Sequence, residues 1–293
     1  MKKIFALILV PVLLSALFGC ATGDGEAVIT TLPPVSTVGI PEEEVTQSIN
    51  TGSFTVNIYS SYAEIAGYVG ENETEVVIPS SVLGIPVKVV GEYAFYGNET
   101  VTKVTLPSSL LVIDRFAFEE CKALNEVVAQ EGLEVIDQAA FRNSTLKIFS
   151  IPSTVVTIGK QAFYRTNLTE AVIPDGVSLI PSFAFYGCEL LTTLTIGKRV
   201  SVIDEKAFHN CKSLKLTALP ENVARLGDYV FMNCTSLGNL FIPKTTAVGE
   251  NAFLGCNKLV IYTPKGAKAI TAAKKYGYEY VECKSAELMN GQE

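Results

Sequence analysis

A phenylalanine that recurs at a nearly constant interval constrains the fold of this chain more than any other feature. Successive copies are separated by 23, 23, 22, 22, 23, 23 and 22 residues, and alanine precedes all of them but one. A period this regular over eight copies predicts a solenoid of stacked units and excludes a single globular core. The eight residues are Phe95, Phe118, Phe141, Phe163, Phe185, Phe208, Phe231 and Phe253.

Each copy combines a short strand with a return segment. In Leu191–Ile196, two apolar residues alternate with threonines, which is typical of a half-buried strand. Most copies then place a proline, which lacks the N–H that a ladder needs and so ends the strand. The return, such as Val155–Phe163, is too short for an independent helix. We therefore predict an α/β repeat solenoid, with a parallel β-sheet on one face and short helical or 3₁₀ turns on the other.

The amino-acid pattern of the repeats allows a more specific prediction, at the level of a protein family. IPSTVVTIGKQAFYRTNL (151–168) and LFIPKTTAVGENAFLGCNKL (240–259) closely resemble the BspA-like leucine-rich repeats of bacterial surface proteins. The resemblance covers about residues 54–281, although Val128-Ala129 and Ile196-Gly197 depart from the apolar-Pro pair. It implies a cell-surface protein that takes part in adhesion or host-matrix interaction.

The first 52 residues are predicted to export and tether the protein. Met1-Lys2-Lys3 followed by the apolar run Ile4–Phe18 is typical of a secretory signal, because 15 residues are too few to span a bilayer. Leu17-Phe18-Gly19-Cys20 resembles a lipobox, so we expect a signal peptide at 1–19 and lipidation of Cys20, with ordinary cleavage as the alternative. Residues 20–52, rich in proline and glutamate, are expected to be a disordered tether, or simply a disordered N-terminus without a role.

The solenoid is predicted to occupy residues 53–282, with a cap at each end. Phe54–Val76 is off-period, and Gly84–Gly91 lengthens the first repeat. At the other end, Lys268–Tyr276 is helical by propensity, Gly277 is placed to stop that helix, and a last strand follows. Residues 283–293 are expected to be a flexible tail.

Composition excludes several classes of function. The net charge is −7, and removal of Lys2 and Lys3 with the signal leaves 21 basic against 30 acidic residues. A chain this acidic has no electrostatic footprint for nucleic acid. The membrane is therefore expected as a partner only through the N-terminal lipid.

No residue pattern indicates an enzyme, a cofactor or a metal site. Five of the seven cysteines lie three residues after a repeat phenylalanine, at a position that elsewhere holds Asn98, Ser144 or Thr166. This interchange favours reduced, buried cysteines that satisfy the turn, although rung spacing alone does not exclude disulfides. The single histidine, His209, lies at a variable position that we expect to be solvated. No C-x₂-C pair or nucleophile–base set accompanies it.

The outward face of the strands is the predicted binding surface. Four of its positions carry apolar side chains, and several of these on one sheet face indicate a contact surface. We predict a non-enzymatic protein that binds a host or neighbouring-cell protein there. One alternative is a surface lipoprotein that binds carbohydrate through Tyr96, Tyr164 and Tyr186, and another is a passive spacer. The four predicted contact residues are Ile148, Val172, Leu216 and Phe241.

Overall fold

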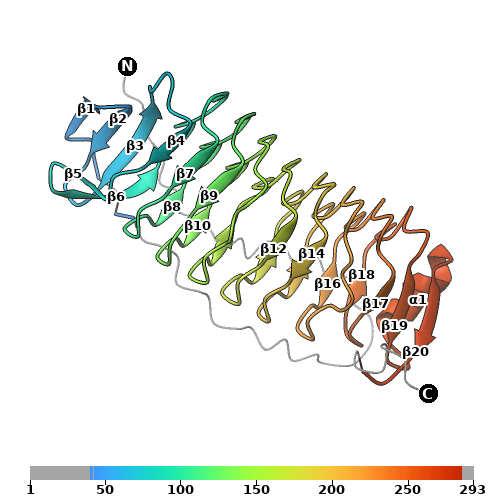
Figure 1. Cartoon of the computed structure of the whole chain (residues 1–293). Coiled ribbons are helices and arrows are strands. Elements are labelled where there is room, and N and C mark those ends of the chain that lie inside the picture. Colours follow the sequence, from blue (N-terminus) through green and yellow to red (C-terminus); the bar gives the residue numbers. More distant parts are fainter. Residues whose placement is uncertain (1–39, 42, 286–293) are drawn as a thin grey trace.

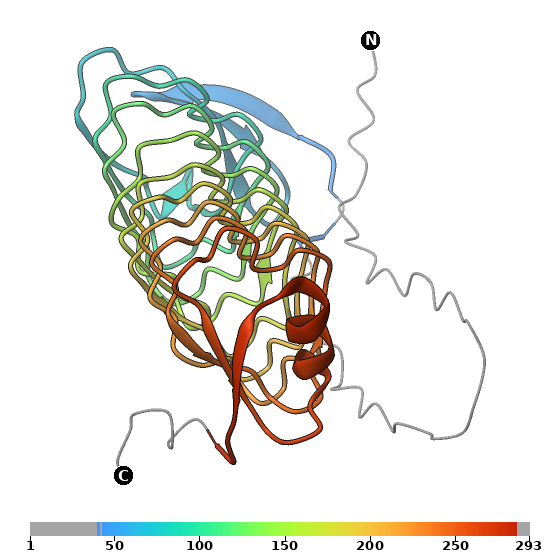
Figure 2. The same ribbon diagram turned by 90° about the vertical axis from the view of Figure 1, so that its right-hand side faces the viewer.

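The repeats form the rungs of an elongated solenoid (Figure 1). The computed structural model of the chain describes residues 40, 41 and 43–285. From the first repeat to the C-terminal cap, strands of neighbouring rungs pair in parallel. The buried apolar side chains join into one core that runs from Phe54 to Ala273. Figure 2 shows the rungs stacked behind one another, with a hairpin at one end and a helix at the other.

One face of the solenoid, here called the long-strand face, carries the strands predicted from the alternating pattern. Each three-residue strand buries its central residue, as Val104 does in Lys103–Thr105. The row divides into the groups β4-β7-β9, β12-β14 and β17-β19-β20. Its strands are β4 (Glu75–Val77), β7 (Lys103–Thr105), β9 (Glu126–Val128), β12 (Glu170–Val172), β14 (Thr193–Thr195), β17 (Asn239–Phe241), β19 (Val260–Thr263) and β20 (Glu279–Glu282).

The return segments carry a second row of short parallel strands ahead of the predicted turns, which are closed by i→i+3 bonds such as that from the N–H of Tyr96 to the carbonyl oxygen of Tyr93. Two-residue strands pair from rung to rung, so their backbone groups are satisfied by neighbouring rungs and no helix is needed. Two residues are too few to display an alternating pattern in the sequence. The strands are β6 (Ile85–Val90), β8 (Val112–Ile113), β10 (Val135–Ile136), β11 (Thr157–Ile158), β13 (Leu179–Ile180), β15 (Val202–Ile203), β16 (Arg225–Leu226) and β18 (Ala247–Val248).

The third side of each rung, here called the turn edge, has left-handed backbone at two positions per rung. The N–H groups of Tyr93, Phe95 and Gly97 donate to carbonyl oxygens of the next rung at 3.3, 2.8 and 2.8 Å, and later rungs repeat the pattern. These bonds offset the cost of positive φ in residues other than glycine. The positive-φ residues are Tyr93, Phe116, Ala139, Gln161, Phe183, Lys206, Tyr229 and Asn251 before each phenylalanine, and Gly97, Glu120, Asn143, Arg165, Gly187, Asn210, Asn233 and Gly255 after it.

The eight repeat phenylalanines form a continuous column in the core. Neighbouring rings stack with centroids 4.8–5.7 Å apart and planes within 21° of parallel. Tyr68 extends the column at the N-terminal end at 5.0 Å, and Tyr278 closes it edge-on at 5.6 Å. Burial of each ring contributes about 1.5–3 kcal/mol to stability.

The N-terminal cap begins earlier in the chain than the sequence predicted. β1 (Gln47–Thr51) pairs antiparallel with β2 (Phe54–Ile58), and Glu43 accepts hydrogen bonds from Ser60 and Ser61. The predicted tether at 20–52 is therefore wrong at its C-terminal end. β1 is an exposed edge strand with polar residues on both faces, so it lacks the apolar alternation of a buried strand. The signal peptide 1–19, Cys20 and the tether up to residue 39 lie outside the described residues.

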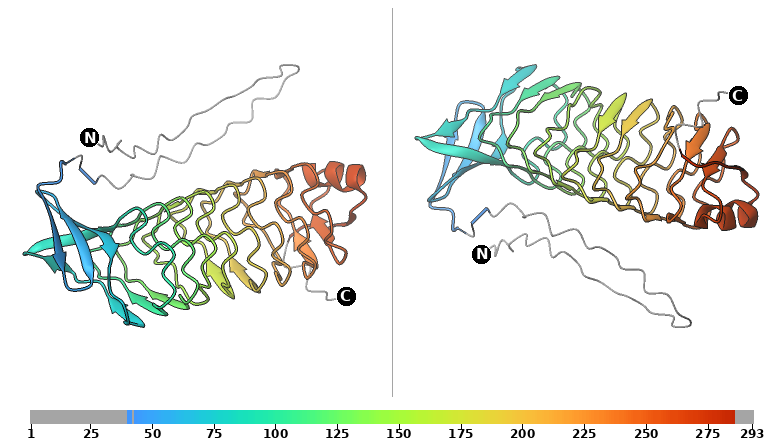
Figure 3. Two further views of the ribbon diagram at one scale, coloured as in Figure 1. Left: turned by 90° about the horizontal axis from the view of Figure 1, so that it is seen from above. Right: turned by 90° about the horizontal axis from the view of Figure 1, so that it is seen from below.

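The remainder of this cap joins the hairpin to the first repeat. β3 (Ala63–Tyr68) pairs antiparallel with β2 and parallel with β6, so it connects the two strand directions. A tight turn at Leu83 and Gly84, both with positive φ, joins β5 (Ser81–Val82) to β6. Figure 3 shows these strands splayed across the N-terminal end of the stack.

The C-terminal cap follows the prediction. α1 (Lys268–Tyr276) ends at Gly277, which adopts the left-handed conformation with φ 74°. The helix buries Ala269 and Ala273 against the last rung, and β20 then pairs in parallel with β19. Cys283 is still tied to the fold, because its N–H donates to the carbonyl oxygen of Thr263 at 3.0 Å. The predicted tail at 286–293 lies outside the described residues.

Candidate functional site

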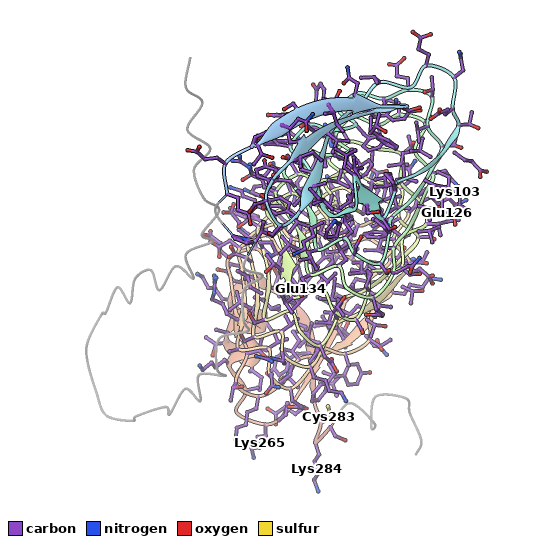
Figure 4. The ribbon with its side chains drawn as sticks, turned by 90° about the vertical axis from the view of Figure 1, so that its left-hand side faces the viewer. Lys103, Glu126, Glu134, Lys265, Cys283 and Lys284 are labelled. Atoms are coloured by element: carbon purple, nitrogen blue, oxygen red, sulfur yellow. The ribbon has the colours of Figure 1, made fainter. Side chains whose placement is uncertain are left out.

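The long-strand face presents two outward positions per strand, and the two columns differ in character. The first column is mainly polar: Lys103 and Glu126 form an ion pair at 3.2 Å and lie next to each other in Figure 4. The second column consists mainly of small or β-branched side chains, such as Val77, Thr105 and Val128, with the aromatic residues Phe241 and Tyr262 near its C-terminal end. An exposed apolar residue in the first column is therefore out of place.

Two of the four predicted contact residues lie on the surface. Ile148 belongs to the rung between β9 and β12, in the first column, and is 50% exposed. Val172 belongs to the next rung, in the second column, and is 55% exposed. The two residues therefore place exposed apolar side chains on successive rungs of the same face.

Leu216 is buried, and its predicted exposure is wrong. In the preceding rung the core position lies nine residues after the repeat phenylalanine and holds Leu194. The same position holds Thr217 in this rung. The chain turns Leu216 inward, where it is 7% exposed, and leaves the Thr217 hydroxyl in solvent. Burial of a hydroxyl without a partner would cost more than this change of register. As a result the rung forms a single bridge, at Ala218, in place of a strand.

Phe241 is also buried, at 2% exposure, although its strand keeps the regular register. Leu240 fills the core position, so the side chain of the next residue, Phe241, belongs to the outward side of β17. It is flanked by Ala218 on the preceding rung and Tyr262 on the following one. The small Ala218 leaves space on the face of the sheet, which a large ring can fill. Leu216 and Phe241 therefore cannot serve as contact residues.

The displaced rung opens a groove beside β14. Its walls are residues 192–198 on one side and 215–220 on the other. In the preceding rung, the N–H of Ile173 donates to the carbonyl oxygen of Thr195 at 2.8 Å. The corresponding N–H of Ile196 has no carbonyl acceptor among the described residues. Lys198 and Lys215 lie along the groove, and neither forms an ion pair with a described residue. The groove is thus a local interruption of the ladder with uncompensated positive charge on an acidic protein.

The tyrosines proposed for carbohydrate binding are not equivalent. Tyr164, Tyr186 and His209 stack face to face, with centroids 4.8 and 4.7 Å apart. Rings in such a stack cover each other and leave their edges for a ligand. Tyr96 is separated from them by the ion pair between Glu119 and Arg142 and is 55% exposed. The predicted ladder of three tyrosines is therefore not continuous.

His209 is buried rather than solvated, because its ring lies flat against Tyr186. Burial lowers the pKa of the imidazole, and the neighbouring Lys206 lowers it further. The Nδ1 atom has no hydrogen-bond partner. No orienting carboxylate contacts the ring, so the geometry supports packing and not general base catalysis.

The repeat cysteines take the structural role predicted for them. Each thiol donates to the carbonyl oxygen of the phenylalanine in the preceding rung, as Cys188 does to Phe163 at 3.0 Å. Ser144 and Thr166 instead bond the phenylalanine of their own rung. Burial raises the pKa of Cys121 to about 12 and that of Cys188 to about 11, which suppresses thiolate chemistry.

The part of the chain that the structure describes contains neither a metal-binding cluster nor a membrane-spanning helix. No cluster of three or more His, Cys, Asp or Glu residues is arranged to hold a metal ion. No helix within residues 40–41 and 43–285 has the length and apolar character needed to cross a membrane.

Comparison with known proteins identifies the family. The BspA type leucine rich repeat region matches the chain at residues 40–169, 88–215 and 156–281, with six copies. The chain therefore belongs to this family, as its repeats indicated. No curated protein matches it.

Solved structures support the same conclusion about the fold. A leucine rich repeat protein of T. pallidum is 26% identical, with a TM-score of 0.53 over 82% of this chain and all of that one. This likeness confirms the predicted leucine-rich-repeat solenoid. A leucine rich cell surface protein from Faecalibacterium prausnitzii is 17% identical, with a TM-score of 0.33 over 83% of this chain and 97% of that one.

Proposed function

We propose that this protein is an exported, surface-tethered and non-enzymatic binding protein whose long-strand face contacts another protein. The observation that carries the proposal is the apolar pair Ile148 and Val172, which are about half exposed in successive rungs of the long-strand face. The groove beside β14 lies one rung further along and extends the area. Apolar groups surrounded by polar ones are typical of a protein contact.

The test uses the full chain against a panel of purified host-matrix and bacterial surface proteins, measured by surface plasmon resonance. The double variant Ile148→Glu, Val172→Glu is expected to weaken the interaction at least about tenfold, because two buried carboxylates would be left without partners at the interface. The matched control is Leu179→Glu, Leu254→Glu, which changes two similarly exposed leucines away from this face, in β13 and on the turn edge.

The control variant is expected to bind like the native chain. Equal binding by both double variants would remove the long-strand face from the contact. Absence of binding across the panel, with the domain folded, would favour the passive spacer.

The anchor is a separate part of the proposal. Cys20 follows Leu17-Phe18-Gly19 at the end of an apolar segment, which supports lipidation and attachment to the outer side of a bacterial membrane. Growth with a clickable fatty-acid analogue should label the native chain and leave Cys20→Ala unlabelled and released into the medium. Equal labelling of the two chains would contradict lipidation at Cys20.

A further inference from the structure

A hollow lies at the N-terminal end of the turn edge, away from the long-strand face. It is lined by Gly67 and Tyr68 at the end of β3, by Gly70 and Glu71 after it, and by residues 93–100 of the first repeat. We call it the N-terminal hollow.

The hollow exists because the hydrogen-bond ladder of the turn edge starts incompletely. In later rungs the preceding rung donates to three carbonyl oxygens, as it does to Arg115, Ala117 and Glu119. In the first repeat only Ala94 receives such a bond, from the N–H of Tyr68 at 2.8 Å. No described residue donates to the carbonyl oxygen of Tyr96. The chain turns away after Tyr68 and leaves that acceptor facing the hollow.

Two tyrosines at the hollow have an open ring face. Tyr93 and Tyr96 belong to the first of the eight repeats, so no preceding repeat covers them; they are 50% and 55% exposed. Tyr93 stacks on Phe116 at 4.9 Å, which fixes its ring, and Tyr96 meets Tyr93 edge-on at 5.6 Å and 82°. The pair forms a rigid aromatic corner, in contrast to the covered rings of Tyr164 and Tyr186.

The polar groups around this corner are predominantly acceptors. Glu71 and Glu99 line the hollow, are exposed, and form no ion pair with a described residue. The side-chain oxygen of Asn98 accepts the N–H groups of Thr100 and Val101 at 3.0 and 2.7 Å, which fixes its amide and leaves the NH₂ group as a donor. The hollow therefore offers two carboxylates, a free carbonyl and one amide donor, together with the hydroxyl groups of Tyr93, Tyr96 and Thr100, which can donate or accept.

From this combination we infer that the N-terminal hollow binds a saccharide built of neutral or amino sugars. The C–H face of a pyranose packs on an aromatic ring, and its hydroxyl groups are donors that match the carboxylates and the free carbonyl. The two unpaired carboxylates repel sugars that carry carboxylate or sulfate groups. The site is independent of the protein contact proposed above, and it replaces the continuous tyrosine ladder as the place for carbohydrate.

The experiment is an oligosaccharide array probed with the full chain, with neutral, N-acetylated, free-amino and acidic glycans, followed by calorimetry on the strongest ligand. We expect binding to neutral or amino glycans and none to acidic ones. Tyr96→Ala should weaken binding at least about tenfold through loss of the stacking surface. Glu99→Gln, which removes no contact within the fold, should weaken it several-fold through loss of a charged acceptor.

Two matched controls distinguish the site from general effects. Tyr164→Ala removes a covered tyrosine and Glu221→Gln an exposed carboxylate elsewhere, and both should bind like the native chain. Ile148→Glu, Val172→Glu should also retain glycan binding, so failure of either proposal is separable from failure of the other. The inference is overturned by absence of neutral or amino hits, by hits that Tyr96→Ala and Glu99→Gln leave unchanged, or by equal binding of a simple alkylammonium ion.

Discussion

The turn edge and the long-strand face are built from the same eight repeats, yet one is regular and the other is interrupted. On the turn edge, every rung has left-handed backbone two residues before and two residues after its phenylalanine. On the long-strand face, the row of strands is broken in the rungs that contain Ile148 and Leu216. The regular side is the one with more unfavourable backbone conformations.

The difference shows which kind of interaction fixes a rung. On the turn edge, three N–H groups per rung donate forward to the next rung, so the backbone itself sets the conformation and accepts almost any side chain. On the long-strand face, the inward side chain sets the register. A threonine at the core position, as at Thr217, is sufficient to shift the chain by one residue. The outward positions of that face are consequently free to vary and to serve in binding.

The largest effect is expected from the aromatic column. Phe185→Ala removes a fully buried ring between two stacked neighbours and should lower the free energy of unfolding by about 3–5 kcal/mol. Val172→Ala on the long-strand face should change it by less than about 0.5 kcal/mol. Denaturant titration of both variants measures the difference. Equal losses of unfolding free energy in the two variants would show that the aromatic column and the long-strand face contribute alike to stability.

An exchange of two adjacent residues should make the long-strand face as regular as the turn edge. In the double variant Leu216→Thr, Thr217→Leu, the leucine occupies the core position of the regular register. The restored ladder should raise the free energy of unfolding by about 1–2 kcal/mol and close the groove. Slower hydrogen exchange at the Ile196 N–H would report the new strand pair; an unchanged rate would mean that the register is set elsewhere.

A buried carboxyl group beside the turn edge also makes the free energy of unfolding depend on pH. Burial raises the pKa of Asp114 to about 6. The folded state therefore binds more protons than the unfolded state between about pH 4 and 6, and stability falls as the pH rises through this range. Asp114→Asn, which keeps the acceptor for the Arg115 N–H, should be more stable than the native chain by about 1 kcal/mol above pH 6. Melting curves should coincide below about pH 4; a constant difference across pH would contradict this cause.

The smallest effect concerns the left-handed positions themselves. Arg165 has φ 53° at a position where Gly97, Gly187 and Gly255 stand in other rungs. Arg165→Gly should be more stable than Arg165→Ala by about 0.5–1 kcal/mol, because glycine adopts this conformation without steric cost. Chemical denaturation of the two variants decides the sign. A more stable alanine variant would show that the strain is negligible here.

The sequence is sufficient to predict the features that depend on the type and spacing of side chains. The phenylalanine column, the cysteine position, α1 with Gly277 as its stop, and the final strand all follow from residue type and spacing. The left-handed turns could not be predicted, because residues as different as Phe116, Ala139 and Lys206 occupy them and the determinant is a hydrogen bond to the next rung.

The exposure of the four predicted contact residues follows from the sequence only in part, for related reasons. Ile148 and Val172 lie in rungs of regular register, so alternation placed them correctly on the surface. The exposure predicted for Leu216 is wrong because alternation alone does not reveal the one-residue shift in register that accompanies Thr217 at the core position. Phe241 is covered by contacts between rungs, which spacing along the chain does not describe. The open faces of Tyr93 and Tyr96 depend on where the first rung ends.

The forward direction of the turn-edge hydrogen bonds has a consequence for assembly. Because each rung donates to the one that follows, an uncapped stack would end in free N–H groups on one side and free carbonyl oxygens on the other. Two copies could then join head to tail and grow into a fibre. Tyr278, whose hydroxyl oxygen accepts the N–H of Phe253, covers one end, and Tyr68, whose N–H donates to the carbonyl oxygen of Ala94, covers part of the other. The outermost strands of the long-strand face, β4 and β20, both carry glutamate and would repel each other. The caps thus oppose head-to-tail growth of the stack into a polymer.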